Sequence, residues 1–405
     1  MNRQVIDLVP DAADCSGCGA CMLVCPKGAI TMQAALDGSL FPVIDQKQCI
    51  GCGRCLRQCV YRQPADLNAP KEACAAVARD SEVVSHSASG GMFAALAKHW
   101  IQCGGLVAGA VMDCSHSVQV YHILSDRVED VQRMQGSKYV QSDAWRCYQA
   151  VLDALAAGKQ VLFSGTPCQV AAIRELTGDP DHLTTIDLIC HGVPPLKLLD
   201  DYVRLLSRRF HGQIEAFRFR DKALKKSFSA SLDVRYGEKV KRFHLRSHEL
   251  SFYKYFLEGA NYRENCYSCP FARLERTADL TIGDYWGVRK RHAADFEAKK
   301  MPDVADWSCV LVNTPKGRRL LDLHAQEISL YASAPEWVAE ENHQLSQPTI
   351  PPEGRMSLKR LYEQKGYGGV EKAFIQEKGG SLKYHLRLCK QLYRNQRAVQ
   401  QDQTK

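Results

Sequence analysis

Short apolar runs separated by polar and glycine-rich stretches follow one another from about residue 72 onward. Four of these runs are compact and aliphatic, as expected for buried strands: residues 104–112, 118–124, 161–168 and 184–190. Two further segments, 92–101 and 143–157, have helical spacing of apolar residues, and Gly158 closes the second at its C-terminal cap. Strands mixed with helices in this way predict an α/β domain.

The first 64 residues show a different pattern. Apolar residues 29–32 and 41–45 flank the turn dipeptide Asp37-Gly38, which predicts a β-hairpin. Residues 65–71 are then a linker. The α/β domain is expected in two parts, 72–195 and 196–345, the second mixing helix, hairpin and loop. A basic helical tail, 346–405, completes an α+β and α/β architecture.

The tail contains a helical pattern over residues 381–393. One face would hold apolar side chains at spacings of four, three and four, with basic residues elsewhere on the surface. The apolar positions are Leu382, Leu386, Cys389 and Tyr393, and the basic ones are Lys383, Arg387, Lys390 and Arg394. We expect a terminal helix packed on its own domain. The alternative is a weak peripheral contact with an acidic partner or a membrane surface.

Composition limits the class of protein. The chain has 405 residues, 45% of them hydrophobic, enough for about two or three globular domains. Its net charge is +8, yet twelve Lys or Arg against four Asp or Glu lie from Arg355 onward, so the rest is neutral and nucleic-acid binding is not expected. No apolar run reaches the roughly 18 residues of a membrane span, and the first residues lack a secretory layout. We therefore expect a cytoplasmic protein.

The chain has eighteen cysteines. In a reducing compartment thiols do not persist as disulfides, so we expect many of these cysteines to be metal ligands. Two runs read C-x2-C-x2-C-x3-C, the spacing that holds four-iron, four-sulfur clusters, with each fourth cysteine serving the neighbouring cluster. One predicted set is Cys15, Cys18, Cys21 and Cys59, and the other is Cys49, Cys52, Cys55 and Cys25. The arrangement is that of a bacterial ferredoxin, although Pro26 follows the first run and Val60 the second. Paired zinc sites, the alternative, favour two cysteine pairs over a quartet.

Four more cysteines are candidates for a third cluster. Cys168 and Cys190 end two predicted strands, and ligands gather at such strand ends in open sheets. Cys266 and Cys269 form a further C-x2-C pair and would complete four thiolates. Buried thiols that serve only as packing are the alternative, and we expect that role for the remaining cysteines: Cys74, Cys103, Cys114, Cys147, Cys309 and Cys389.

Two segments are candidates for binding a phosphate group. Residues 87–91, Ser-Ala-Ser-Gly-Gly, precede a predicted helix whose free N–H groups favour an anion, although a serine there is more often a simple cap. Residues 135–142 add Lys138 and several hydrogen-bond donors, enough for a pyrophosphate; a polar surface loop is the alternative. No G-x-G-x-x-G fingerprint follows a strand, so a Rossmann-type nicotinamide site is disfavoured.

Six segments in this order resemble the beta subunits of coenzyme F-420 (deazaflavin) hydrogenases and dehydrogenases: residues 89–91, 136–142, 163–169, 187–193, 266–269 and 282–287. The resemblance covers about residues 70 to 345. It implies a flavin-binding α/β domain with FAD and a four-iron cluster, and fusion to a two-cluster ferredoxin module occurs in the family. With the two candidate loops, it assigns cofactor binding to Ser87, Ser89, Gly90, Gly91, Gly136, Ser137, Lys138, Tyr139, Gln141, Ser142, Thr166, Gln169 and Asp284.

Lys138 and His191 are candidates for a catalytic role, and Asp284 is a further group that would act at the flavin. Lys138 would place a charge near the flavin, unless it is an ordinary solvated lysine. His191, beside Cys190, would relay a proton near neutral pH, unless it only donates a hydrogen bond. Asp284 precedes two aromatic residues and offers a carboxylate, unless this is a buried aromatic corner.

Three functions remain open on the sequence. The favoured one is an FAD-dependent iron–sulfur oxidoreductase that links a ferredoxin or a partner redox subunit to a small-molecule substrate, deazaflavin-like or unknown. The second is an electron-transfer subunit without substrate chemistry of its own. The third is a polyferredoxin whose α/β part is only a scaffold, and it predicts no flavin.

Overall fold

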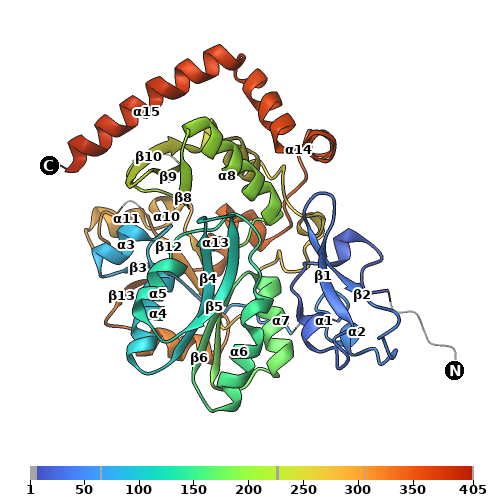
Figure 1. Ribbon diagram of the computed structural model, residues 1–405. Helices are drawn as coiled ribbons and strands as arrows, with labels where there is room; N and C mark the ends of the chain where they lie inside the picture. The colour runs from blue at the N-terminus through green and yellow to red at the C-terminus, as the bar shows by residue number, and fades with distance from the viewer. Residues whose placement is uncertain (1–6, 64–65, 225–227, 305, 404–405) are drawn as a thin grey trace.

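The computed structural model describes residues 7–63, 66–224, 228–304 and 306–403. An eight-stranded mixed sheet lies at the centre of the protein (Figure 1). Its strands lie in the spatial order β13 (Ile328–Ser333), β3 (Glu72–Ala78), β12 (Ser308–Val312), β11 (Leu280–Asp284), β7 (Leu183–Leu188), β6 (Val161–Gly165), β4 (Leu106–Asp113) and β5 (Gln119–Ser125). The four neighbours β11, β7, β6 and β4 are parallel, and the outer pairings are antiparallel. The carboxyl ends of four strands therefore meet at one edge.

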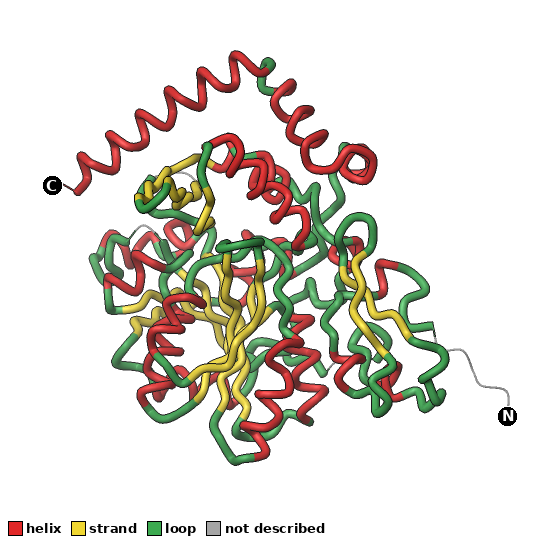
Figure 2. The backbone as a smooth tube through the Cα atoms, in the orientation of Figure 1, coloured by secondary structure: helices red, strands yellow, loops and turns green. Residues whose placement is uncertain are grey.

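Helices cover both faces of this sheet (Figure 2). Successive strand residues point to opposite faces, so Leu162 packs on one side with α4 (Met92–Gln102), α5 (Val128–Met134) and α12 (Pro315–Leu323). Phe163 packs on the other with α6 (Trp145–Ala156) and α7 (Pro167–Thr177). Fully burying each aliphatic or aromatic side chain contributes about 1.5–3 kcal/mol. Four shorter helices also belong to this domain: α3 (Ser81–His86), α10 (Val288–Arg291), α11 (Ala293–Glu297) and α13 (Pro335–Glu341).

A second, three-stranded antiparallel sheet lies beside the first, in the order β10 (Lys239–Arg246), β9 (Ser229–Tyr236) and β8 (Gln213–Phe219). It shares one apolar core with α8 (Leu196–Phe210), α9 (Ser251–Leu257) and α14 (Arg355–Glu377), through Tyr202, Phe252 and Phe374. The expected part 196–345 is therefore divided between two sheets, since β11, β12 and β13 return to the central one. Likewise α14 is core structure, and not part of a separate tail.

The terminal helix α15 (Ser381–Gln403) confirms the predicted helix, and it packs on the body (Figure 1). Its buried side chains are Tyr384, Leu388 and Asn395. The Tyr384 hydroxyl donates to the carbonyl oxygen of Glu249 at 2.9 Å, and the Asn395 amide donates to that of His244 at 2.9 Å. The predicted apolar stripe faces solvent instead, with Leu382, Leu386, Cys389 and Tyr393 all exposed.

The N-terminal module contains the predicted hairpin, formed by β1 (Ile30–Ala34) and β2 (Leu40–Ile44), with α1 (Ala20–Leu23) and α2 (Arg54–Arg57). It packs directly on the α/β domain: a Cβ at Gly19 would lie 2.6 Å from the Cβ of Trp145 at the start of α6. Four short 3-10 helices complete the described structure: η1 (Ala12–Asp14), η2 (Ser247–Glu249), η3 (Glu264–Ser268) and η4 (His343–Leu345).

Most expected elements of residues 92–190 are present, with one error. The predicted strand 161–168 ends at Gly165, and Thr166 caps a helix in which Pro167 is the first residue. Proline favours this position because its missing N–H would have no partner there. Cys168 therefore lies in the first turn of α7, and not at a strand end.

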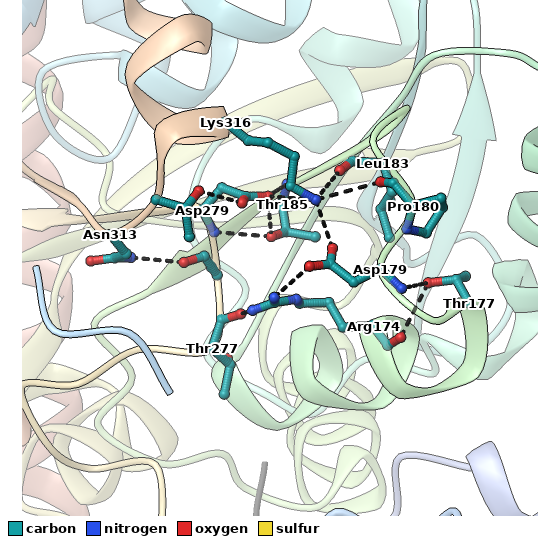
Figure 3. Close-up of polar contacts among 12 residues, drawn as sticks. Arg174, Thr177, Asp179, Pro180, Leu183, Thr185, Thr277, Asp279, Asn313 and Lys316 are labelled. Atoms are coloured by element: carbon teal, nitrogen blue, oxygen red, sulfur yellow. Dashed lines mark hydrogen bonds and ion pairs between the residues drawn. The ribbon is translucent and has the colours of Figure 1, made fainter. Parts of the chain in front are cut away.

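Buried polar contacts fasten the opposite edge of the sheet, at the amino ends of β7 and β11 (Figure 3). The Asp279 carboxylate accepts hydrogen bonds from the backbone N–H and the hydroxyl of Thr185, both at 2.8 Å, and from Thr314. Lys316 donates to Asp179 at 2.7 Å. Buried polar groups paired in this way hold the strands in register. None of the described helices is long and apolar enough to span a membrane.

Candidate redox site

Twelve cysteines line three small cavities, four to each. Cys15, Cys18, Cys21 and Cys59 line one of about 30 Å³. Cys25, Cys49, Cys52 and Cys55 line a second of about 20 Å³. Cys168, Cys190, Cys266 and Cys269 line a third of about 40 Å³. The structure thus brings together the three sets expected from spacing, and no three His, Cys, Asp or Glu of the described ranges are placed to hold a single metal ion.

The two N-terminal sets are built in the same way. Gly19 and Gly53, with φ of 77° and 68°, begin the short helices α1 and α2, and this left-handed conformation suits glycine. Backbone N–H groups point at sulfur: that of Gly17 lies 3.3 Å from Cys15 Sγ, and that of Ala29 lies 3.3 Å from Cys25 Sγ. Such N–H donors stabilise thiolate ligands and tune a cluster.

The third set comes from three separate parts of the chain. Cys168 lies on α7, Cys190 follows β7, and Cys266 and Cys269 lie on η3 and directly after it. Burial raises the pKa of Cys266 to about 12. A thiol in such a place becomes a thiolate at neutral pH when a metal binds it. The donor set and the cavity therefore fit a four-iron cluster.

A much larger cavity, about 280 Å³, lies at the carboxyl ends of β6, β7 and β11 and beside the middle of β4. This volume is close to the lower end of ligand sites. Eleven of the thirteen predicted cofactor-binding residues line it: Ser87, Ser89, Gly91, Gly136, Ser137, Lys138, Tyr139, Ser142, Thr166, Gln169 and Asp284. It is also lined by the candidate catalytic residue His191.

The start of α4 forms one wall of this cavity. Gly91 precedes the helix with φ of 86°, and no side chain caps the first turn, so the first N–H groups of Met92, Phe93 and Ala94 are available to an anion. Gly90 lies behind this wall: a Cβ there would lie 2.5 Å from the carbonyl oxygen of Ala76. Its role is close packing, and the geometry of the helix start suits a phosphate.

The side chain of Lys138 forms hydrogen bonds with backbone carbonyl groups of the protein. Its ammonium donates to the carbonyl oxygens of Arg133, Met134 and Gln135, at 3.0, 2.6 and 2.9 Å. These are the last carbonyls of α5, which a cation stabilises. Burial lowers the pKa of Lys138 to about 7. Its first role is to close α5 beside the cavity.

His191 lies between the two cavities, because it lines both the large one and the third thiol cavity. Desolvation lowers its pKa. Thr166, Cys190, Gly192 and Val193 also line both cavities. The thiol set and the large cavity therefore share a wall.

Asp284 is held by an arginine that the sequence pattern did not indicate. Arg220 donates to the Asp284 carboxylate at 2.5 Å and to the carbonyl oxygen of Ala88 at 2.7 Å. The guanidinium also lies over the rings of Phe228 and Trp286. The carboxylate is thus a partner of Arg220, which ties β8 to the segment before α4.

Gln141 does not line the large cavity, which contradicts its assignment there. Its amide donates to the carbonyl oxygen of Ser16 at 2.9 Å, and its oxygen accepts from Arg263 at 2.8 Å. It belongs to the contact between the N-terminal module and the α/β domain. A position in a polar loop carries no signal for which partner its side chain meets.

The N-terminal module also reaches the third thiol cavity. Ser16 and Tyr61 line this cavity, and the Tyr61 hydroxyl accepts from Asn265 at 2.8 Å. Val60 packs on Ala171 and Phe271. The set of Cys15 therefore lies next to the set of Cys168, with the large cavity on the far side of the latter.

Several residues of the site were not predicted. His122 lines the large cavity, with its ring 3.0 Å from the carbonyl oxygen of Ser164 and stacked on Phe163. Ser308 and Asn342 also line it, from segments without a recognisable motif. Among the six cysteines expected to be packing thiols, Cys103 and Cys389 are exposed, so that expectation was wrong for these two.

Comparisons with known proteins agree with the two cysteine-rich parts of this geometry. Residues 14–62 match the model of the 4Fe-4S dicluster domain. Residues 158–336 match the model of the C terminus of the coenzyme F420 hydrogenase/dehydrogenase beta subunit. Among solved structures, a chain of the F420-reducing [NiFe] hydrogenase complex from Methanosarcina barkeri is similar at 15% identity and a TM-score of 0.43, over 78% of this chain and 95% of that one. No curated protein sequence matches this chain.

Proposed function

We propose that this protein is an FAD-dependent iron–sulfur oxidoreductase. The matches of residues 14–62 to the 4Fe-4S dicluster domain and of residues 158–336 to the C terminus of the coenzyme F420 hydrogenase/dehydrogenase beta subunit support this proposal. The protein links a ferredoxin-type carrier or a partner redox subunit to a hydride-accepting small molecule, deazaflavin-like or of another kind. The N-terminal eight cysteines hold two clusters, and Cys168, Cys190, Cys266 and Cys269 hold a third.

One observation carries this proposal: the third thiol set shares a wall with the large cavity, through Thr166 and residues 190–193. The N-terminal module meets the other side of that thiol set through Ser16 and Tyr61. A row of sites thus leads from the exposed Cys52 to the cavity at the carboxyl ends of the parallel strands, where ligands of open sheets bind.

The residues of the large cavity have distinct proposed roles. The N–H groups at the start of α4 and the turn at Gly136 would bind the pyrophosphate of FAD. Thr166 and Gln169, joined in a capping box, would orient the ring near Cys190, and His191 would hold or move a proton there. A flavin, when bound, exchanges electrons singly with clusters and in pairs with a hydride acceptor.

Anaerobic purification followed by iron, sulfide and flavin analysis tests the proposal. Three four-iron clusters require about twelve irons per chain. The proposed flavin site requires one FAD per chain. About eight irons without flavin would refute it and leave only the N-terminal module.

Turnover distinguishes the enzyme from a subunit without substrate chemistry. The isolated chain should reduce an organic acceptor with reduced ferredoxin or a reduced dye as the electron donor. An isolated chain that is inert with a full set of cofactors, and active only with a partner, would establish the subunit function instead.

A further inference from the structure

Arg263 is a buried guanidinium without a carboxylate partner. Only 1% of the residue is exposed. Its donors meet neutral oxygens: Asn265 at 3.2 Å, Gln141 at 2.8 Å, and the carbonyls of Cys15 and Leu40 at 3.1 Å each. Its guanidinium also lies over the ring of Phe41, 5.0 Å from the ring centre, and no Asp or Glu in the described part of the chain forms an ion pair with it. A buried charge without a counter-ion is strongly disfavoured, so its retention calls for a compensating anion.

The neighbours of Arg263 identify that anion. One end of the side chain holds the loop of Cys15, and its backbone carbonyl accepts from the N–H of Cys266 at 3.1 Å. A Cβ at Gly17, between Cys15 and Cys18, would lie 3.1 Å from its guanidinium nitrogen. Arg263 therefore lies between the first N-terminal thiol set and the third set, and acts on both.

Arg276 provides a contrast within the same site. It lines the third thiol cavity and is 2% exposed. Its guanidinium, however, lies 3.1 Å from the fully buried carboxylate of Asp187. That pair is close to neutral as a unit, whereas the charge of Arg263 is free to act on the thiolate sets.

We propose that Arg263 raises the reduction potentials of the two clusters on either side of it, and so sets the electron affinity of the step between module and α/β domain. This inference rests on the proposed function, since it requires clusters at both thiol sets. In each case one electron is added to a cluster by an external reductant, with no bond formed or broken and no proton transferred. A fixed cation stabilises the added negative charge, because local charge and hydrogen bonds set cluster potentials.

The second N-terminal set should not share this effect. Cys52 lies in an exposed loop, and the guanidinium of Arg57, itself exposed, donates to the Cys52 carbonyl oxygen at 3.2 Å. Solvent and salt screen an exposed charge. Arg57→Met is therefore a matched control for the loss of a guanidinium near a cluster.

The test is a mediated redox titration of the anaerobically purified full chain, followed by electron paramagnetic resonance. Arg263→Met should shift two of the three cluster potentials to more negative values. Arg263→Lys, which keeps the positive charge, should leave them close to the wild-type values, and Arg57→Met should leave all three within error. Iron content measured on each sample shows whether the clusters are assembled.

A second variant tests the proposal even if Arg263→Met does not fold. Gln141→Glu places a carboxylate where an amide oxygen now lies 2.8 Å from the guanidinium, so the contact with Arg263 is kept and its charge neutralised, while the hydrogen bond to the Ser16 carbonyl is lost. It should shift the same two potentials in the same direction. Unchanged potentials in either variant, with full iron content, would overturn the proposal and leave Arg263 a structural residue. If wild-type protein lacks the third cluster, the proposed function fails, while the potential of the Cys15 cluster still tests Arg263.

Discussion

Burial determines the chemistry of individual thiols in this protein. It raises the pKa of Cys18 and Cys266 to about 12, so neither thiol ionises at neutral pH without a metal. Their neighbours at each cavity are other cysteines, whose own ionisation would oppose theirs. Metal binding and deprotonation are therefore coupled at these residues.

Replacement of one ligand tests the third cluster. Cys269→Ser should remove about a third of the iron and leave the other two clusters in place, because each four-iron cluster is held by its own set of four cysteines. Iron and sulfide analysis measures this. Cys103→Ser, at an exposed cysteine outside all three cavities, is the control, and unchanged iron in Cys269→Ser would exclude this residue as a ligand.

Lys138 should make stability depend on pH. Burial lowers its pKa from 10.5 to about 7, so between these values the unfolded chain holds a proton that the folded chain lacks. Unfolding is then increasingly disfavoured as pH rises through this range. Against Lys138→Met, the wild-type apparent Tm should improve from pH 7 to pH 9. A difference between the two proteins that does not change with pH would contradict the pKa shift.

At the scale of elements, helix starts and strand ends position the site. The carboxyl ends of β6, β7 and β11, with the middle of β4, form the floor of the large cavity, and the uncapped start of α4 forms one wall. The opposite ends of β7 and β11 are held by Asp279 and Thr185 (Figure 3). One edge of the sheet is thus left open for a ligand, and the other is closed by hydrogen bonds.

The start of α4 can be tested at Gly91, whose φ of 86° an alanine adopts only with strain. Gly91→Ala should displace the first N–H groups and lower flavin content several-fold, while iron content stays the same. Flavin absorbance after extraction measures this. Gly104→Ala is the matched control, because Gly104 has φ of 85° at the other end of the same helix and faces open space. Equal flavin in both variants would place the phosphates elsewhere.

The polar network predicts a loss of stability. Asp279→Asn replaces an acceptor of Thr185 and Thr314 with an amide and leaves a buried donor unpaired, which costs about 1–3 kcal/mol. Thermal unfolding followed by circular dichroism should show a lower Tm. Asp322→Asn removes a carboxylate from an exposed ion pair with Arg318 and should change Tm little.

At the scale of the whole molecule, segments far apart in sequence complete one another. The N-terminal module contributes Ser16 and Tyr61 to a cavity whose cysteines lie more than a hundred residues later. Helix α14, close to the C-terminus, shares the core of the second sheet with α8 and α9. Contacts of this kind join module, central sheet and second sheet into one structure (Figure 1).

Removal of α15 tests how the last segment contributes. Ending the chain at Gly380 deletes Tyr384 and Asn395 with their hydrogen bonds to the carbonyl oxygens of Glu249 and His244, and should lower Tm by about 1–3 °C if about 1–2 kcal/mol is lost. Iron and flavin content should stay the same, because no described residue of α15 lines any of the cysteine cavities or the large cavity. Loss of liposome or partner binding on this truncation would instead assign the exposed stripe a docking role.

Local sequence patterns determined many of the helices and strands of this protein and many residues of its candidate site. Cysteine spacing alone predicted which residues line the two N-terminal cavities, because three closely spaced thiols converge within one short loop and the repeated pattern takes the fourth from the other run. Apolar runs predicted the strands β4, β5 and β7 and the helices α4 and α6, since their periodicity reflects burial on one side. The motifs around Gly91 and Gly136 likewise identified walls of the large cavity.

Only the tertiary structure decided which side chains from distant segments contact one another. Nothing local distinguishes Gln141, which faces the module, from Ser142, which lines the cavity; Arg263 and His122 had no motif at all. Cys168 was misplaced at a strand end because Thr166 and Pro167, a helix start, follow an apolar run without a break. Side-chain neighbours come from packing between segments, and a single sequence records only the neighbours along the chain.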